Sequence, residues 1–139
     1  KKYLMKKLLL IFSIVSIIVS CQVLAQKQDT PETVFYIPLT KTSTHDRVSI
    51  TLVAVLEDSR CPRNTTCIWA GKAVVKILVS SAGVASKELI VVFQNESETI
   101  IATTKDSVFT ALKLLPYPDG AYSKEIVYQL QVSKKGIKL

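Results

Sequence analysis

The stretch EDSRCPRNTTCIWAG, residues 57–71, joins the two longest strand patterns of this chain. Residues 47–56 before it and residues 68–80 after it alternate between apolar and other side chains, and many of these residues are β-branched. A period of two is typical of strands that bury one face, so the stretch is predicted to be a loop between two central strands. The face predicted to be buried in the first strand comprises Val48, Ile50, Leu52, Ala54 and Leu56.

Shorter strand patterns surround this pair and fill the rest of the chain. They cover residues 34–39, 88–93, 99–103, 107–115 and 125–132, with turns between them, including a predicted turn at 41–46. The segment 107–115 also fits the spacing of a short helix. About seven short strands with regular turns predict an all-β fold, an immunoglobulin-like antiparallel β-sandwich occupying residues 34–139 as one domain.

The two cysteines of the central stretch enclose only five residues. In an exported domain, Cys61 and Cys67 are predicted to form a disulfide. Closing so short a loop is worth ~2–3 kcal/mol, so its main effect would be to fix the shape of the loop. Trp69 is expected to pack at the end of the sandwich over this bridge.

The charged residues of the loop have two interpretations. Asp58 can cap turn N–H groups while Arg60 makes a local ion pair, or the two can form a ligand-facing pair on a rigid loop. We favour the first, because Asp and Ser are ordinary turn formers. If the loop does bind a partner, the candidate residues are Asp58, Arg60, Arg63 and Trp69, with Tyr117 and Tyr122 beside them. For the two tyrosines we favour the interpretation that they are ordinary half-buried aromatic residues at a sheet edge.

The motifs of this region resemble those of a known family. Asp-Ser-Arg-Cys-Pro at residues 58–62, followed by Cys-Ile-Trp-Ala-Gly at 67–71, is similar to the signature of a largely uncharacterised family of small exported bacterial proteins. Leu-Pro-Tyr-Pro at 115–118 and Tyr128 are similar to the C-terminal part of that family. The resemblance covers residues 48–132. It implies a signal or lipoprotein leader and a β-sandwich, and it implies no activity.

Residues 1–25 have the pattern of a secretion signal. Four lysines precede an apolar run from Leu8 to Val19, which is shorter than the roughly 20 residues that span a bilayer. Signal peptidase I could cleave before Gln26, or Cys21 could be lipidated as in a bacterial lipoprotein. Either translation starts at Met5 or the sequence is a fragment at its N-terminus. The polar residues 26–33 are predicted to be a tether.

Charge and composition exclude several classes of function. Four of the 18 basic residues and none of the 11 acidic ones lie in 1–25, which leaves 14 basic and 11 acidic residues, a net charge of +3, in 26–139. Scattered charge of this size does not predict nucleic-acid binding. His45, the only histidine, lies in a predicted turn beside Asp46, which does not provide a triad or a copper site. We predict no catalytic residue, no metal site and no cofactor.

These observations lead to two hypotheses. The first is a non-enzymatic binding or structural module of the cell envelope, exported to the periplasm or anchored in the membrane of a Gram-negative bacterium. Its partner would be a protein or small ligand of the envelope, and it would meet the membrane only through its leader or a lipid at Cys21. The alternative is a histidine-independent envelope hydrolase, or an accessory subunit of one, which would need a cleft with two converging carboxylates.

Overall fold

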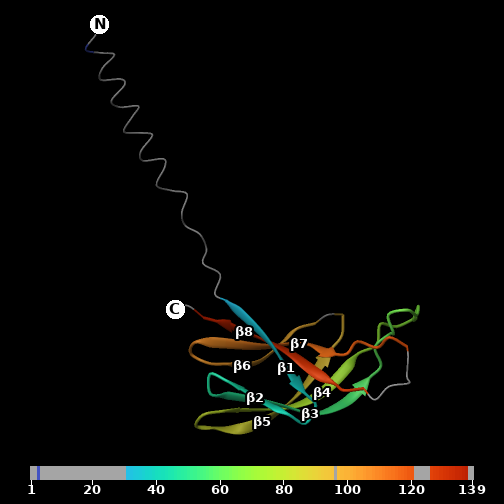
Figure 1. Cartoon of the computed structure of the whole chain (residues 1–139), viewed down its shortest axis with the longest axis horizontal. Helices are drawn as coiled ribbons and strands as arrows, with labels where there is room; N and C mark the ends of the chain where they lie inside the picture. Colours follow the sequence, from blue (N-terminus) through green and yellow to red (C-terminus); the bar gives the residue numbers. More distant parts are fainter. Residues whose placement is uncertain (1–2, 4–30, 96, 121–125, 138–139) are drawn as a thin grey trace.

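The computed structural model describes residues 3, 31–95, 97–120 and 126–137 as two antiparallel sheets of four strands each (Figure 1). The first sheet has the order β1-β8-β7-β6 and the second the order β2-β3-β4-β5. The strands are β1 (Glu32–Pro38), β2 (Thr42–His45), β3 (Val48–Asp58), β4 (Ala73–Ser81), β5 (Val84–Phe93), β6 (Thr99–Thr103), β7 (Ser107–Leu115) and β8 (Gln129–Gly136). The prediction of an all-β antiparallel sandwich is therefore confirmed.

The connections between the strands form a meander. Consecutive strands are neighbours from β2 to β5 and from β6 to β8, whereas the first strand, β1, pairs with the last strand, β8. The described chain changes sheet after β1 and after β5. The likeness to an immunoglobulin domain extends to two packed antiparallel sheets, but the order of strands does not interleave as it does there. The described residues form eight strands rather than about seven, because 42–45, within the predicted turn, pair with β3 as β2.

The core lies between the two sheets and comes from alternate residues of each strand. In β4, Ala73, Val75 and Ile77 are fully buried, whereas the residues between them are only half-buried. Phe109, Leu114 and Leu130 of the first sheet are also buried, and they belong to the same hydrophobic cluster. This alternation is the reason that the period of two in the sequence predicts the sandwich.

Strand β3 departs from regular alternation in its second half. Its pairing with β4 shifts between Leu52 and Ala54 and again between Val55 and Glu57. Each shift adds an unpaired residue, so the positions opposite the buried residues of β4 become Leu52, Val55 and Asp58. The prediction that Leu56 belongs to the buried face is wrong, since 53% of this side chain is exposed.

Other predicted boundaries also change. The second long strand begins at Ala73 instead of residue 68, because the cysteine loop occupies residues 59–72. Segment 107–115 is strand β7, which removes the helical alternative, and the last strand begins at Gln129 rather than 125. Pro38 is the last residue of the edge strand β1. At this position the N–H that proline lacks is not needed for a hydrogen bond inside the sheet. The predicted tether overlaps β1 at residues 32 and 33.

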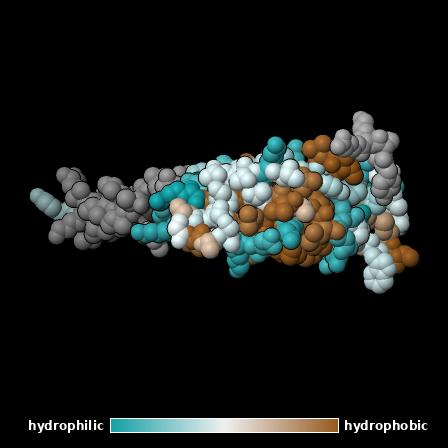
Figure 2. Space-filling view, turned by 90° about the horizontal axis from the view of Figure 1, so that it is seen from below, coloured by the Kyte–Doolittle hydropathy of each residue, from teal (hydrophilic) through white to brown (hydrophobic). Residues whose placement is uncertain are grey.

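The outer face of the second sheet carries exposed apolar side chains. Figure 2 shows hydrophobic atoms gathered in the middle of this face and hydrophilic atoms around them. Val53, Ile90 and Val92 are among the exposed residues of these strands. Within the described residues, no helix is long and apolar enough to cross a membrane. The predicted cleavage sites, Cys21 and Tyr122 lie outside the described residues.

Candidate functional site

The connection between β3 and β4, residues 59–72, forms a closed loop that we call the cysteine loop. The predicted disulfide between Cys61 and Cys67 is confirmed, with their Cα atoms 5.9 Å apart. At the base of the loop, the Ser59 N–H donates to the Lys72 carbonyl at 2.8 Å, and the Cys61 N–H donates to the Ala70 carbonyl at 3.1 Å. These two bonds extend the pairing of β3 and β4 into the loop as far as Cys61.

Arg60 fixes the base of the loop to the other sheet. Its Nε and Nη2 donate to the two carboxylate oxygens of Asp58, each at 2.7 Å. Nη1 donates to the carbonyl of Leu114 at 2.7 Å, and Nη2 also donates to the carbonyl of Pro116 at 2.9 Å. The Tyr128 hydroxyl donates to Asp58 at 3.2 Å. We call Asp58, Arg60, Tyr128 and the two carbonyl groups the sheet clamp.

The sheet clamp is largely removed from water. The side chains of Arg60 and Asp58 are only 7% and 9% exposed. Burial acts to raise the pKa of Asp58, but the hydrogen bonds and charge of Arg60, with the Tyr128 hydroxyl, outweigh it and hold this pKa below 3.8. Burial and the charge of Asp58 raise the pKa of Tyr128 above 10.0. The predicted local ion pair thus exists, and most of its surface is buried within the protein rather than facing a ligand.

Gly71 allows the two sides of the loop to approach each other. Its φ is +69°, and a Cβ atom built there would lie 1.8 Å from the Ser59 carbonyl oxygen. Any other residue would collide with this backbone atom and would also adopt an unfavourable φ. The glycine of the Cys-Ile-Trp-Ala-Gly motif is therefore required by the loop geometry.

The tip of the loop projects into solvent. Ile68 is 92% exposed and Trp69 is 82% exposed. The expectation that Trp69 packs over the disulfide is wrong. The disulfide and the glycine turn close the loop outside the core, so this ring gains little contact with the sheets. We call Ile68 and Trp69 the apolar tip.

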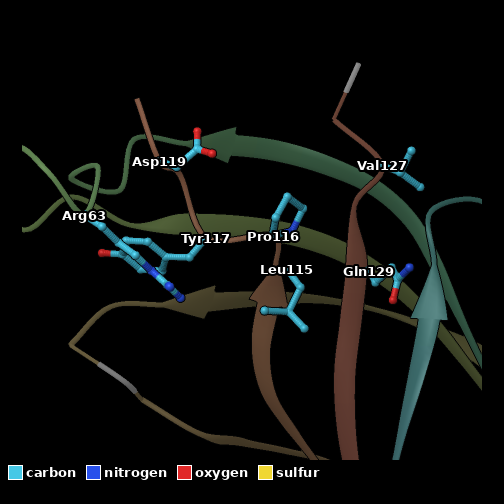
Figure 3. Close-up of a pocket in the computed structure, with 7 residues that line it drawn as sticks. All are labelled: Arg63, Leu115, Pro116, Tyr117, Asp119, Val127 and Gln129. Carbon is cyan, nitrogen blue, oxygen red and sulfur yellow. The ribbon is translucent and has the colours of Figure 1, made fainter. Parts of the chain in front are cut away.

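Arg63 joins the cysteine loop to the segment that follows β7. Its N–H donates to the Pro118 carbonyl at 3.1 Å, and its guanidinium lies 5.4 Å from the centre of the Tyr117 ring. Arg60 lies 4.9 Å from the same ring. Figure 3 shows Arg63 beside Tyr117 at one side of a hollow of about 600 Å³, with Val127 and Gln129 at the other side.

A second hollow, which we call the loop hollow, has a volume of about 630 Å³. It lies between the cysteine loop, the end of β5 and the end of β7. Its polar and charged lining residues are Arg60, Arg63, Gln94, Asn95, Lys113 and Tyr117. The structure thus brings Arg63 and Tyr117 of the predicted surface together and leaves Trp69 outside this lining.

Sequence reasoning missed two parts of the site. Tyr128 was named only for its resemblance to the C-terminal part of a family, although its hydroxyl reaches Asp58 from 70 residues away. The carbonyl groups of Leu114 and Pro116 belong to the backbone, so no pattern of side chains in the sequence could have indicated that they bind Arg60. His45, predicted to be a surface turn residue, lies in β2, where its ring is 4.0 Å from that of Phe35 and bonds Ser43.

No three His, Cys, Asp or Glu side chains in the described part of the chain gather where they could hold a metal ion. Comparison with known proteins found no matching family model, no similar curated protein and no similar solved structure. The resemblance of the Cys-Pro and Cys-x-Trp-Ala-Gly motifs to a family of exported proteins therefore stays a prediction.

Proposed function

We propose that this chain is a non-enzymatic binding module of the bacterial cell envelope that contacts a protein partner through the apolar tip. The observation that carries the proposal is the exposure of Ile68 and Trp69 on a loop that is otherwise held tightly. Burying each such side chain would contribute about 1.5–3 kcal/mol. Tryptophan is also enriched among the residues that dominate protein interfaces.

The attachments of the loop support this role. The disulfide, the sheet clamp and the contact of Arg63 with Pro118 fix the loop before any partner arrives. A loop that is already ordered loses less conformational entropy on binding, so more of the contact energy appears as affinity. The disulfide is also compatible with an oxidising, exported compartment.

The position of the tip fits a tethered module. Pro38 pairs with Gln129, next to the Leu115 end of β7, whereas Glu32 pairs with Lys135 at the opposite end of the sandwich. The chain therefore enters the domain at the end away from the cysteine loop (Figure 1). A leader or a lipid at Cys21 would leave the apolar tip directed away from the point of attachment, toward other envelope components.

Site-specific photo-crosslinking in the native envelope tests this proposal. A photoreactive amino acid in place of Ile68 should give a discrete adduct with one partner. The matched control replaces Ile100 of β6, an isoleucine that is 65% exposed on the other sheet. Trp69→Ala in the Ile68-labelled protein should reduce the adduct. Equal labelling at the two positions, or no adduct at Ile68, would contradict the proposal.

A carboxylate-based hydrolase is the alternative, and one hollow bears on it. Asp46 and Asp106 both line a hollow of about 500 Å³ at the end opposite the cysteine loop. However, Asp46 accepts hydrogen bonds from Lys134 and Ser107, which lower its pKa, and a general acid would need the opposite shift. If Asp46→Asn abolished a hydrolytic activity of the purified protein, this alternative would replace the binding module.

A further inference from the structure

We infer that the loop hollow binds an anionic group, a carboxylate or a phosphate, of the ligand. This inference rests on the proposed binding role of the loop end and adds the chemical class that is recognised. The hollow lies beside the cysteine loop and has a volume of about 630 Å³, within the range of small-molecule sites. It is larger than a single anion, so the group would belong to a larger molecule.

The charges around the hollow support an anion. Arg63 and Lys113 line it, and neither has an ion-pair partner among the described residues. Arg60 also lines it, but its charge is already balanced by Asp58. No acidic residue is among the described residues that line the hollow. Two cations that have no ion-pair partner among the described residues therefore line one concave space.

The two further hollows described above differ from the loop hollow in the charges of their lining residues. The hollow of Figure 3 shares Arg63 and Tyr117 with the loop hollow, but Asp119 also lines it. The hollow at the opposite end contains Arg47 and Lys105 together with two aspartates. Of the three, only the loop hollow has cationic lining without an acidic residue among the described side chains.

The remaining lining residues suit the same ligand class. Gln94 and Asn95 provide side-chain amide donors, and Phe93, Leu114 and Leu115 provide apolar walls. Apolar walls exclude water and so strengthen the attraction between a bound anion and nearby cations. Arg63 is positioned by its ring contact with Tyr117, and a guanidinium can donate two parallel hydrogen bonds to a carboxylate or phosphate.

Titration of the ¹⁵N-labelled full chain with small probes tests the inference. Acetate and inorganic phosphate, added at low ionic strength, should shift the backbone amides of Arg63, Lys113 and Tyr117 and should saturate. Acetamide has the shape of acetate but no charge, and it should cause no saturable shift of these amides. The relative affinities of acetate and phosphate show which anion the hollow prefers.

Charge-removing variants separate a site from general ionic effects. Arg63→Gln and Lys113→Gln should each weaken binding about fivefold, as expected for the loss of one partly exposed ion pair. Lys87→Gln removes the same charge from β5, outside the hollow, and should leave the affinity unchanged. Equal weakening by all three variants, or shifts that never saturate, would overturn the inference.

One variant distinguishes this inference from the proposed function. Trp69→Ala removes the apolar tip but leaves the lining of the hollow intact. If this variant loses cross-linking of the partner and still binds acetate or phosphate, both proposals stand. If the parent protein cross-links through Ile68 but shows no saturable anion binding, the tip is supported and the anion site is refuted.

Discussion

At the residue scale, Arg60 accounts for the largest number of specific contacts in the site. Its three guanidinium nitrogens donate four hydrogen bonds. Nε and Nη2 donate to the carboxylate of Asp58, and Nη1 and Nη2 donate to the carbonyl groups of Leu114 and Pro116. A lysine could supply the charge but not this planar arrangement of donors. The identity of residue 60 is therefore set by geometry as well as by charge.

We expect Arg60→Ala to lower the free energy of unfolding by about 3–5 kcal/mol, because it leaves the buried carboxylate of Asp58 unpaired. Urea denaturation followed by circular dichroism would measure the change. Arg63→Ala is the matched control and should cost less than about 1 kcal/mol, because Arg63 is exposed. A similar loss in both variants would show that the sheet clamp has no special role.

Two glycines with positive φ provide a second comparison. Gly71→Ala places a Cβ 1.8 Å from the Ser59 carbonyl oxygen, whereas Gly83, at φ +80°, has no atom within 4 Å of such a Cβ. Gly83→Ala should lower the free energy of unfolding by about 1–2 kcal/mol from backbone strain alone. Gly71→Ala should cost clearly more and should accelerate hydrogen exchange of the Ser59 and Cys61 amides. Equal losses of stability in the two variants would mean that the backbone around Gly71 moves easily to make room for a Cβ atom.

At the element scale, the two irregularities of β3 decide which side chains reach the interior. Regular alternation would bury Ala54 and Leu56, but the shifts move the inward positions to Val55 and Asp58. Asp58 lies opposite Ala73, a small residue that leaves room for a carboxylate and its partners. The bulges thus place the acid of the sheet clamp without interrupting the β3–β4 pairing.

The cysteine loop should keep its base when the disulfide is removed. Replacing both Cys61 and Cys67 by serine should lower stability by about 2 kcal/mol, because the unfolded chain regains the freedom of a short loop. Amides at the tip, at 68 and 69, should then exchange faster. Amides at Ser59 and Lys72 should stay protected, because the Ser59 N–H donates to the Lys72 carbonyl, the Lys72 N–H donates to Ser59 Oγ, and both residues lie close to Arg60. Loss of protection at both places would show that the disulfide alone maintains the loop.

At the scale of the whole molecule, one carboxylate bridges the two sheets at each end of the sandwich. At one end, Asp58 of β3 binds Arg60 and the Tyr128 hydroxyl. At the other end, Asp46, between β2 and β3, accepts hydrogen bonds from Ser107 of β7 and Lys134 of β8. The shared core, the two connections after β1 and β5, the bond from the Arg63 N–H to the Pro118 carbonyl and the ring contact of Phe35 with His45 also join the sheets.

This arrangement predicts that acid opens the sandwich. The pKa values of Asp46 and Asp58 are both below 3.8 in the folded protein, so the unfolded chain binds more protons on acidification. Their stabilisation is complete above the unfolded pKa, near 4, and is lost as the pH falls through the folded values. Urea midpoints measured from pH 6 to pH 2 should therefore fall steeply below pH ~4.

The double variant Asp46→Asn, Asp58→Asn provides the control for this pH dependence. It should be less stable at pH 6 and should show a flatter pH profile than the parent protein, because neither amide titrates. Glu57, whose pKa is lowered by Ser59 and Lys72, would still contribute a smaller slope. An unchanged profile would exclude both aspartates as the cause of acid sensitivity.

The strands with regular alternation were predictable because their pattern depends only on which residues avoid water. The residues of β4 follow this rule. β7 follows it only as far as Ala111, because a register shift between Ala111 and Lys113 moves the next buried position to Leu114. The pairing of Cys61 with Cys67 was predictable for another reason, since the two cysteines are close in sequence. β2 was not predictable, since Thr42–His45 is a short polar segment that forms a strand only because β3 lies beside it. Trp69 was misplaced because hydrophobicity suggests burial but does not show whether a surface is within reach.

The sequence by itself determined an all-β sandwich, the position of its central loop and the disulfide within that loop, because these follow from local periodicity and short separations. Only the tertiary structure decided that Arg60 joins the two sheets, that the tip stays in solvent and that Arg63 and Lys113 line one hollow. The contacts of Arg60 and the joint lining of the hollow depend on residues about 50 or more positions apart and on backbone carbonyl groups. The exposure of the tip depends on how the closed loop lies relative to the core. The pattern of side chains along a single strand carries no information about distant residues or about the partners of backbone carbonyl groups.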